Sequence, residues 1–237
     1  MKVYVINLDK NAERMKFMDT QLKNNGMDYE RVSAVYGAKL SKEERSHVFC
    51  KIRSFLASGT RLRDGEIGCA ISHCMVYKNM INNGIDAAVV LEDDIIVNEE
   101  ISMVIEKIEH FMNCAKAQVF LLSSFGVPQK NKSEIEKIES GMCTDGYVIT
   151  LPAARCIFMA NYPVITVADK WSRWKQRFGV ELYRVWPTVV CQDNDRFGTD
   201  IAIVKSNAPK GVRKLFFKIC RVFELAIDWF CYKICGR

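Results

Sequence analysis

The opening of the chain follows a strand, helix, strand pattern of apolar and polar positions. Residues 2–8 alternate and contain β-branched side chains, which indicates a strand, and the next residues place their apolar side chains on one helical face. Residues 28–35 predict a second strand. Ser41 is followed three residues later by Glu44, which predicts a capping box for a helix through about Leu56. This order of elements indicates a parallel sheet with crossover helices.

Strand and helix patterns continue to alternate through most of the remaining chain. We expect helices over residues 66–82, 99–114, 152–160 and 169–178, and strands over residues 87–99, 117–123, 146–150 and 181–190. Residues 125–140 are charged and contain Pro128, which predicts a surface excursion. We therefore predict one α/β domain over residues 1–204, followed by a basic tail over residues 205–237.

Three consecutive acids end a short apolar run within residues 87–99. Glu92, Asp93 and Asp94 would repel one another, and their burial would be costly unless a cation neutralised them. Their oxygen-only ligand set suits Mg²⁺ or Mn²⁺, which substrate phosphates often share. An exposed acidic turn without a ligand is the alternative interpretation.

A second polar group is expected near these acids. Asn7 and Asp9 follow the first strand, and in open parallel sheets ligands bind beyond the carboxyl ends of the strands. This placement favours a functional site over an accidental acidic turn. It does not identify a reaction.

The composition is that of a folded protein with unpaired thiols. Of the 237 residues 49% are hydrophobic, which excludes global disorder. The ten cysteines are scattered and no secretory leader precedes them, so a reducing cytosol is the expected compartment. Cys69 and Cys74 lack the spacing of a zinc knuckle, and we expect no structural zinc. No apolar run is long enough to predict a membrane-spanning helix.

The tail supplies the positive sign of the net charge, which is +6 for the whole chain. Residues 213–235 have helical spacing, with apolar side chains on one side and Lys214, Lys218, Arg221 and Asp228 on the other. We expect an amphipathic helix that lies on an anionic membrane surface. A helix docked on the body of the protein is the alternative. We expect no nucleic acid partner, because the basic residues are confined to one helix without a reading motif.

Six short segments within about residues 1–199 are informative because of their order and spacing. They are VINLDKNAERM, SAVYG, GEIGCAISHCMVY, VVLEDDI, DGYVITLPAA and ITVADKW. Together they resemble the glycosyltransferase family 25 pattern, whose bacterial members include lipooligosaccharide galactosyltransferases and whose animal relatives modify collagen hydroxylysine. The chain departs from the family at Thr144-Asp145-Gly146, where the family often has Gly-Thr before its aromatic strand.

The resemblance implies a GT-A-like fold, which is a single nucleotide-binding α/β domain with a mixed, mostly parallel sheet. The predicted amphipathic helix would follow it at the C-terminus. The resemblance also implies that the acidic motif holds Mn²⁺ or Mg²⁺ on a nucleotide-sugar diphosphate, and that the sugar is transferred with inversion. A metal held by carboxylates would neutralise the diphosphate as it leaves.

The expected activity is transfer of a hexose from a UDP-hexose donor to a lipid-linked oligosaccharide. Galactose from UDP-galactose is the first choice, with a lipooligosaccharide or lipopolysaccharide core as the acceptor. The expected location is cytoplasmic, peripheral on the inner face of the cytoplasmic membrane. A catalytically silent, membrane-associated sugar- or nucleotide-binding protein is the alternative. A metal-dependent phosphohydrolase ranks last, because the sequence offers no second ligand cluster with histidines.

The resemblance and the strand alternation assign roles to the acidic motif. Glu92 and Asp94 would point to one side of the strand end and Asp93 to the other. Asp94 is therefore the first metal ligand. Glu92 either helps it or reaches the ribose, and Asp93 approaches the donor sugar.

Other donor contacts are implied by the matching segments. Asn7, Leu8 and Arg14 resemble the nucleotide-side segment of the family, although Arg14 could equally be a charge on a helix surface. Ser72 and His73 are candidates for contacts to the donor phosphate or sugar. Their alternative is a purely structural role.

An inverting transfer needs a base for the acceptor hydroxyl, and a carboxylate is the usual choice. We predict Asp169, whose alternative role is the N-cap of the helix after it. Asp193 and Asp195 are the next candidates, and Gln192 would complete the metal or donor site.

Three further residues near these segments have two interpretations each. Trp171 and Trp174 would stack on an acceptor sugar or pack in the core. Glu66 would cap its helix or take part in the chemistry.

Overall fold

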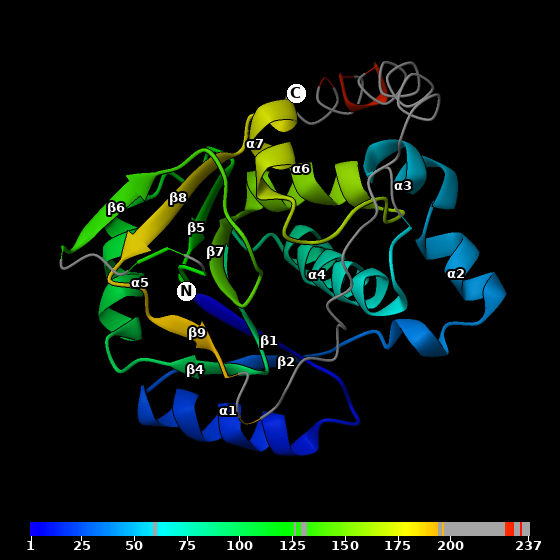
Figure 1. The fold of residues 1–237 in the computed structure, drawn as a ribbon. Coiled ribbons are helices and arrows are strands. Elements are labelled where there is room, and N and C mark those ends of the chain that lie inside the picture. The colour runs from blue at the N-terminus through cyan, green and yellow to red at the C-terminus, as the bar shows by residue number, and fades with distance from the viewer. Residues whose placement is uncertain are drawn as a thin grey trace.

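The computed structural model describes residues 1–58, 61–125, 127–128, 132–193, 196, 226–229 and 233. Its centre is a seven-stranded sheet in the order β2-β1-β3-β7-β5-β8-β6 (Figure 1). The strands are β1 (Lys2–Asn7), β2 (Glu30–Ser33), β3 (Ala87–Glu92), β5 (Gln118–Leu121), β6 (Glu134–Lys137), β7 (Gly146–Thr150) and β8 (Glu181–Trp186). The pairings make β6 and β7 antiparallel to the other five. The predicted α/β class with a mixed, mostly parallel sheet is confirmed.

Helices cover both faces of this sheet. The named α-helices are α1 (Ala12–Asn24), α2 (Lys42–Val48), α3 (Lys51–Ser58), α4 (Asp64–Asn83), α5 (Ile101–Phe111), α6 (Leu151–Asn161) and α7 (Trp171–Phe178). One apolar core joins the sheet to α4, α6 and α7, and a second joins its other face to α1 and α5 (Figure 1). Alternate residues of β3 enter the two cores, so both sides of the strand are buried. This explains why its apolar run is nearly continuous.

The acidic segment differs from the single strand predicted over residues 87–99. β3 ends at Glu92, and β4 (Ile95–Val97) pairs instead with β9 (Val190–Gln192) in a separate two-stranded sheet. The backbone N–H of Asp193 donates to the carbonyl of Asp94 at 2.8 Å, which extends this pairing into the bend. The pairing therefore brings Gln192 beside the acids, although about a hundred residues separate them in the chain.

Two other predictions required correction. The helix expected through Leu56 is divided into α2 and α3, because Phe49 pairs with Val164 between them. The surface excursion expected over residues 125–140 contains β6, a short and partly exposed edge strand. The capping box of Ser41 and Glu44 is confirmed by both of its hydrogen bonds.

Most of the predicted amphipathic tail lies outside the described residues. Residues 226–229 are helical, and Asp228 is buried against α7, with ion pairs to Arg173 at 2.8 Å and to Arg177. At this position the polar side of the segment faces the body of the protein. Among the described residues, no helix has the length and apolar character needed to cross a membrane.

Candidate active site

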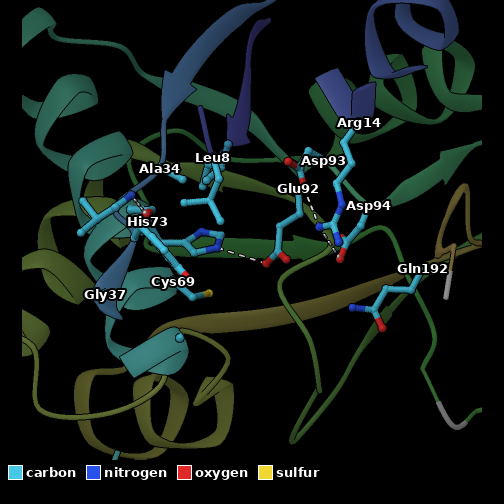
Figure 2. Close-up of a pocket in the computed structure, with 15 residues that line it drawn as sticks. Leu8, Arg14, Ala34, Gly37, Cys69, His73, Glu92, Asp93, Asp94 and Gln192 are labelled. Atoms are coloured by element: carbon cyan, nitrogen blue, oxygen red, sulfur yellow. Dashed lines mark hydrogen bonds and ion pairs between the residues drawn. The ribbon is translucent and has the colours of Figure 1, made fainter. Parts of the chain in front are cut away.

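A pocket at the carboxyl edge of β1 and β3 gathers most of the predicted donor residues. Figure 2 shows how they converge from separate elements. The predicted residues that line it are Leu8, Arg14, Ser72, His73, Glu92, Asp93, Asp94 and Gln192. Asn7 is not part of this lining but contacts Asp93, which is. Asp169 lines an adjoining pocket that shares Cys69, Glu92 and Gln192 with the first. The sequence therefore predicted a group of residues that does meet in space.

Arg14 of α1 is held between two of the three acids. Its Nη1 atom lies 3.3 Å from Asp93 Oδ1 and 3.6 Å from Asp94 Oδ2, and its side chain is only 12% exposed. The alternative interpretation of Arg14 as a helix-surface charge is wrong. The predicted alternation of the acids also ends at Glu92, because Asp93 and Asp94 lie in a bend and both contact Arg14.

Asn7 fixes the position of Asp93. Its Nδ2 donates to Asp93 Oδ2 at 2.6 Å and to the carbonyl of Asn11 at 3.1 Å. Its Oδ1 accepts from Arg31 Nε at 2.8 Å. Asn7 is 2% exposed, so all of its polar atoms are used within the protein. The structure thus places it as a support of the acidic motif, and a direct contact with a donor stays a prediction.

Asp94 is the least satisfied of the acids. Burial, followed by the charges of Glu92 and Asp93, raises its pKa to about 7, although Arg14 acts in the opposite direction. Burial also raises the pKa of Asp93. Asp94 Oδ1 is buried and has no hydrogen-bond partner among the described residues. A buried carboxylate oxygen without a partner, close enough to two further carboxylates to be affected by their charge, fits the needs of a hard divalent cation.

Glu92 faces the opposite wall of the pocket. His73 Nε2 lies 3.3 Å from Glu92 Oε1, and the hydroxyl of Thr144 donates to the same oxygen. Burial acts to raise the pKa of Glu92, but the hydrogen bond and charge of His73, together with Thr144 and Arg14, hold it below its usual value. Of the three acids, Glu92 is therefore the one whose pKa the surrounding residues lower.

His73 is itself positioned by a buried pair of tyrosines. Its Nδ1 lies 2.7 Å from the hydroxyl of Tyr147, which lies 2.8 Å from the hydroxyl of Tyr77. The ring is 1% exposed, and its Nε2 edge is directed at Glu92. The structural and functional interpretations of His73 are thus compatible, because a fully packed ring presents one nitrogen to the pocket.

Ser72 has a well-defined structural role. Its hydroxyl donates to the carbonyl of Gly68 at 2.7 Å and accepts the backbone N–H of Val35 at 2.8 Å. These bonds tie α4 to the segment after β2 at the pocket wall. A contact between Ser72 and a donor stays a prediction.

Asp169 lines the adjoining pocket, which shares Cys69, Glu92 and Gln192 with the pocket of the acidic motif. The helix after it begins at Trp171 with Lys170 as its N-cap residue. The Asp169 carboxylate instead accepts the backbone N–H of Cys143 at 3.2 Å. The N-cap alternative for Asp169 is therefore wrong, and its role as a base stays a prediction.

The runner-up acids are placed differently. Asp193 accepts the backbone N–H of Arg196 at 3.2 Å, and its carboxylate lies 3.6 Å from the guanidinium of that residue. Asp195 lies outside the described residues. Asp193 therefore already has a cationic partner.

Both tryptophans belong to the core. Trp171 is 1% and Trp174 0% exposed, and their ring N–H groups donate to the carbonyls of Cys143 and Ala168. The predicted stacking on an acceptor sugar is wrong for both in this structure. Glu66 accepts the backbone N–H of Arg63 at 2.7 Å, so its predicted role at the start of its helix is confirmed.

The sequence predictions did not name Thr144, Asp145 or Tyr147 as residues of the site. Thr144 and Tyr147 contact Glu92 and His73, and the buried Asp145 has its pKa raised to about 6 by burial and by Glu92. The sequence predicts a strand from residue 146 and contains DGYVITLPAA among its family-like segments, but neither feature gives residues 144–147 a role in the site. A strand that begins directly after two polar residues could have pointed to this wall, since β7 lies beside β3.

The fold and site together define an α/β protein with a partly buried acidic pocket at the carboxyl edge of its sheet, suited to a cation and a phosphorylated ligand. The chain belongs to glycosyltransferase family 25, because the profile described as "Glycosyltransferase family 25 (LPS biosynthesis protein)" matches residues 1–171. The family resemblance seen in the six segments is thereby confirmed.

Relatives share this region at low identity. Procollagen galactosyltransferase 1-B of Xenopus laevis is 26% identical over 173 residues, which cover 68% of this chain and 28% of that protein. A Haemophilus influenzae protein, described provisionally as a glycosyltransferase, is 24% identical over 174 residues, or 70% of this chain and 60% of that protein. The chain thus spans less than two thirds of either relative. A solved glycosyltransferase involved in glycosylation of the major capsid of PBCV-1 aligns with 74% of this chain and 67% of its own at 9% identity, with a TM-score of 0.37.

Proposed function

We propose that this chain is an inverting, metal-dependent glycosyltransferase that moves galactose from UDP-galactose to a lipooligosaccharide or lipopolysaccharide core. The observation that carries the proposal is the buried oxygen of Asp94, which has no partner among the described residues and lies in a pocket formed by family-matching segments. Membership of the family supports the reaction class. The name of the Xenopus relative supports galactose, and the family description supports a lipopolysaccharide acceptor.

Asp94 and Glu92 would hold the Mn²⁺ or Mg²⁺ ion. The donor set consists of carboxylate oxygens, as hard cations require, and one of those oxygens is still unpaired. The bound ion would supply charge neutralisation for the leaving diphosphate. Arg14 would add a fixed positive charge on the same side, already oriented by Asp93.

One of the two adjoining pockets would bind the donor and the other the acceptor. The first contains the acids, Arg14 and His73, which suits a nucleotide diphosphate, and the second contains Asp169. They meet at Glu92 and Gln192, so a sugar at that boundary would lie between the two groups. Asp169 would accept the proton of the acceptor hydroxyl, and its bond from the Cys143 N–H would keep the carboxylate oriented.

A lipid-linked acceptor would make attachment to an anionic membrane surface useful. The basic residues of the tail support this part of the proposal, and most of them lie outside the described residues. The ion pairs of Asp228 with α7 show that part of the segment is anchored on the body.

The direct test is turnover by the purified chain with Mn²⁺ and a panel of nucleotide sugars. We expect UDP-galactose to be hydrolysed or transferred fastest, with loss of turnover in Asp94→Ala. Glu106→Ala is the matched control, because Glu106 is an exposed acid on α5. No turnover with any donor, in folded protein that still binds UDP, would favour the catalytically silent alternative.

The acceptor needs a separate experiment. Mass spectrometry of the lipooligosaccharide of the source cell, with and without the gene, should show the loss of one hexose. An unchanged oligosaccharide would contradict the proposed acceptor while leaving the donor chemistry intact.

A further inference from the structure

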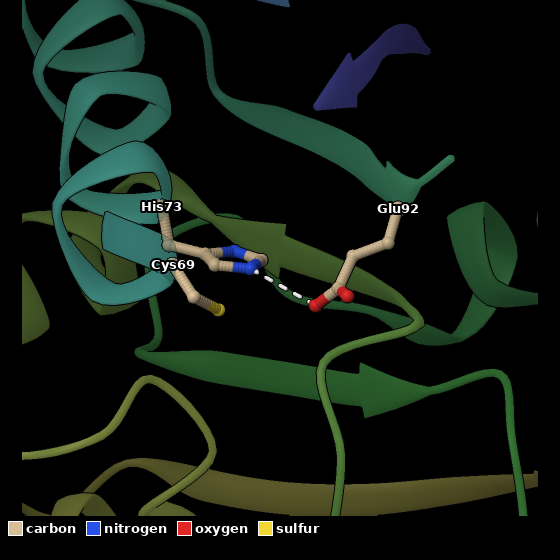
Figure 3. A group of neighbouring side chains, drawn as sticks. All are labelled: Cys69, His73 and Glu92. Carbon is tan, nitrogen blue, oxygen red and sulfur yellow. Dashed lines mark hydrogen bonds and ion pairs between the residues drawn. The ribbon is translucent and has the colours of Figure 1, made fainter. Parts of the chain in front are cut away.

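Cys69, His73 and Glu92 form a compact cluster between α4 and the end of β3 (Figure 3). One potential ligand atom from each residue lies within 4.8 Å of the other two. The cluster holds a thiol, an imidazole and a carboxylate, which is a different ligand set from the aspartates beside it. Asp93 and Asp94 are not part of it.

The helix itself places two of these groups together. Cys69 and His73 are four residues apart on α4, so their side chains lie on the same helical face. Both are directed from α4 toward the end of β3, where Glu92 meets them (Figure 3). The cluster is therefore built on two regular elements and does not depend on a loop.

The surroundings of His73 match those of a metal-binding imidazole. A ligating histidine commonly donates its second ring N–H to a fixed acceptor, which sets the tautomer. The hydroxyl of Tyr147 is 2.7 Å from Nδ1 and is itself bonded to Tyr77 at 2.8 Å. The Tyr147 hydroxyl can accept a hydrogen bond from Nδ1–H, so Nε2, the nitrogen that faces Glu92, is the one that would bind a cation in its unprotonated form.

The spacing is close to that of a tetrahedral site. Ligand bonds of about 2.0–2.3 Å place neighbouring ligand atoms roughly 3.3–3.8 Å apart in a tetrahedral zinc site. His73 Nε2 and Glu92 Oε1 are 3.3 Å apart, so this pair already fits. Cys69 and Glu92 line both adjoining pockets, so a fourth position for water or another ligand is open.

We propose that Cys69, His73 and Glu92 bind a borderline-soft divalent cation of the Zn²⁺ class, at a site distinct from the proposed Mn²⁺ or Mg²⁺ ligand Asp94. Thiolate and imidazole ligands select zinc over magnesium or manganese. On binding, the Cys69 S–H bond breaks, a sulfur–metal bond forms, and the proton passes to solvent. The site requires neither a nucleotide nor an acceptor, so it can be tested apart from the glycosyl transfer.

Because Glu92 belongs to both proposed metal sites, occupation of the Zn²⁺ site should affect the Mn²⁺ or Mg²⁺ site. Glu92 would serve the soft cation through the oxygen that now faces His73, and it is also the second proposed ligand of the hard cation. Occupation by Zn²⁺ would therefore weaken the binding of Mn²⁺. This expectation rests on the proposed function, whereas the zinc site itself does not.

The primary test uses the chelator-treated full chain, Co²⁺ as a spectroscopic probe and Zn²⁺ as a competitor, without nucleotide. Wild type should bind one Co²⁺ with a thiolate-to-metal charge-transfer absorption that one equivalent of Zn²⁺ removes. Cys69→Ser should lose this absorption, and Cys69→Ser and His73→Gln should each weaken Zn²⁺ binding by about 10–100-fold. Cys114→Ser is the matched control because Cys114 is exposed after α5 and far from the cluster in sequence. Asp94→Ala should keep the signal, which separates the two sites.

A second measurement covers the case in which a variant does not fold. In wild type, Zn²⁺ should slow alkylation of Cys69, read by mass spectrometry, and leave Cys114 unaffected. Absence of the charge-transfer absorption in wild type, its persistence in Cys69→Ser, or alkylation of Cys69 at an unchanged rate would each overturn the proposal. Loss of glycosyl transfer alone would not bear on it.

Discussion

Arg14 Nη1 lies 3.3 Å from Asp93 Oδ1, and this contact joins α1 to the bend after β3 across 79 residues of sequence. Because Asn7 holds the other oxygen of Asp93, that carboxylate is fixed from two sides. Asp94, its neighbour, shares Arg14 only at 3.6 Å and keeps an unpaired oxygen. Asp93 is therefore fixed in position, the pKa of Glu92 is lowered by its partners, and Asp94 keeps one oxygen available for a ligand.

The buried, unpaired oxygen of Asp94 should lower the free energy of unfolding once the carboxyl is ionised. Its pKa is raised in the folded protein to about 7, so the folded state holds a proton that the unfolded chain releases near pH 4. The free energy of unfolding then falls as pH rises between these values. Without metal at pH 8, the free energy of unfolding of Asp94→Asn should be about 1–2 kcal/mol higher than that of wild type. At pH 4 the two free energies should be nearly equal.

Chemical denaturation at both pH values in chelator measures this effect. Glu106→Gln, at an exposed acid, should change neither value. An Asp94→Asn variant that is less stable than wild type at pH 8 would contradict the assignment of Asp94 as an unsatisfied acid.

Thr144 should influence the pH below which kcat/KM falls. Its hydroxyl helps to hold the pKa of Glu92 below the usual value, and one hydrogen bond is worth about 1 kcal/mol, or roughly 0.7 pH unit. In Thr144→Val the pKa of Glu92 should rise. The acidic limb of the kcat/KM profile should move upward by about that amount, while activity at pH 8 changes less. An unmoved limb would mean that ionised Glu92 is not required.

Asp169 should control the rate of transfer more than donor binding. Loss of a general base typically lowers the rate by about 10²–10⁴-fold. Asp169→Asn should therefore lower kcat by this order and leave the KM for UDP-galactose within a few-fold of wild type. Asp193→Asn is the competing variant. A larger loss of kcat in Asp193→Asn than in Asp169→Asn would indicate that Asp193, and not Asp169, is the general base.

Asp228 should contribute to stability through α7. It is 2% exposed between Arg173 and Arg177, and removal of one partner from a buried ion pair typically costs about 3–5 kcal/mol. Asp228→Asn should lower the free energy of unfolding by about 2–4 kcal/mol. Glu139→Gln is the control for a second ion pair to the same helix, because Glu139 is 85% exposed and pairs with Lys175 of α7. Equal effects of the two changes would show that the tail does not dock in solution.

Local pattern predicted the α/β class, most of the elements and an acidic site at the carboxyl edge of the sheet. Arg14, His73 and Glu92 meet because each follows or faces the carboxyl edge of a strand, and the order of strands and helices predicts that edge. The family segments then identified which residues of the edge to name. The α/β class followed from the same alternation.

The remaining errors come from contacts between distant segments. The pairing of β4 with β9 divides the acidic segment and brings Gln192 to it, and no local pattern encodes that partner. β6 was missed because an edge strand is half exposed and its sequence, EIEK, is mostly charged. Cys69 was compared only with Cys74, and the four-residue step from Cys69 to His73 was not considered. The expectation of no structural zinc stays a prediction.

The most direct test of the central claim is the affinity of UDP for the chain, measured by calorimetry with and without Mn²⁺. Wild type and Glu106→Ala should bind UDP at least about tenfold more tightly with Mn²⁺, because the ion joins the diphosphate to the carboxylates. Asp94→Ala should bind UDP weakly, and Mn²⁺ should not change its affinity. Equal affinity with and without Mn²⁺ in wild type, or an unaltered Mn²⁺ effect in Asp94→Ala, would contradict the account.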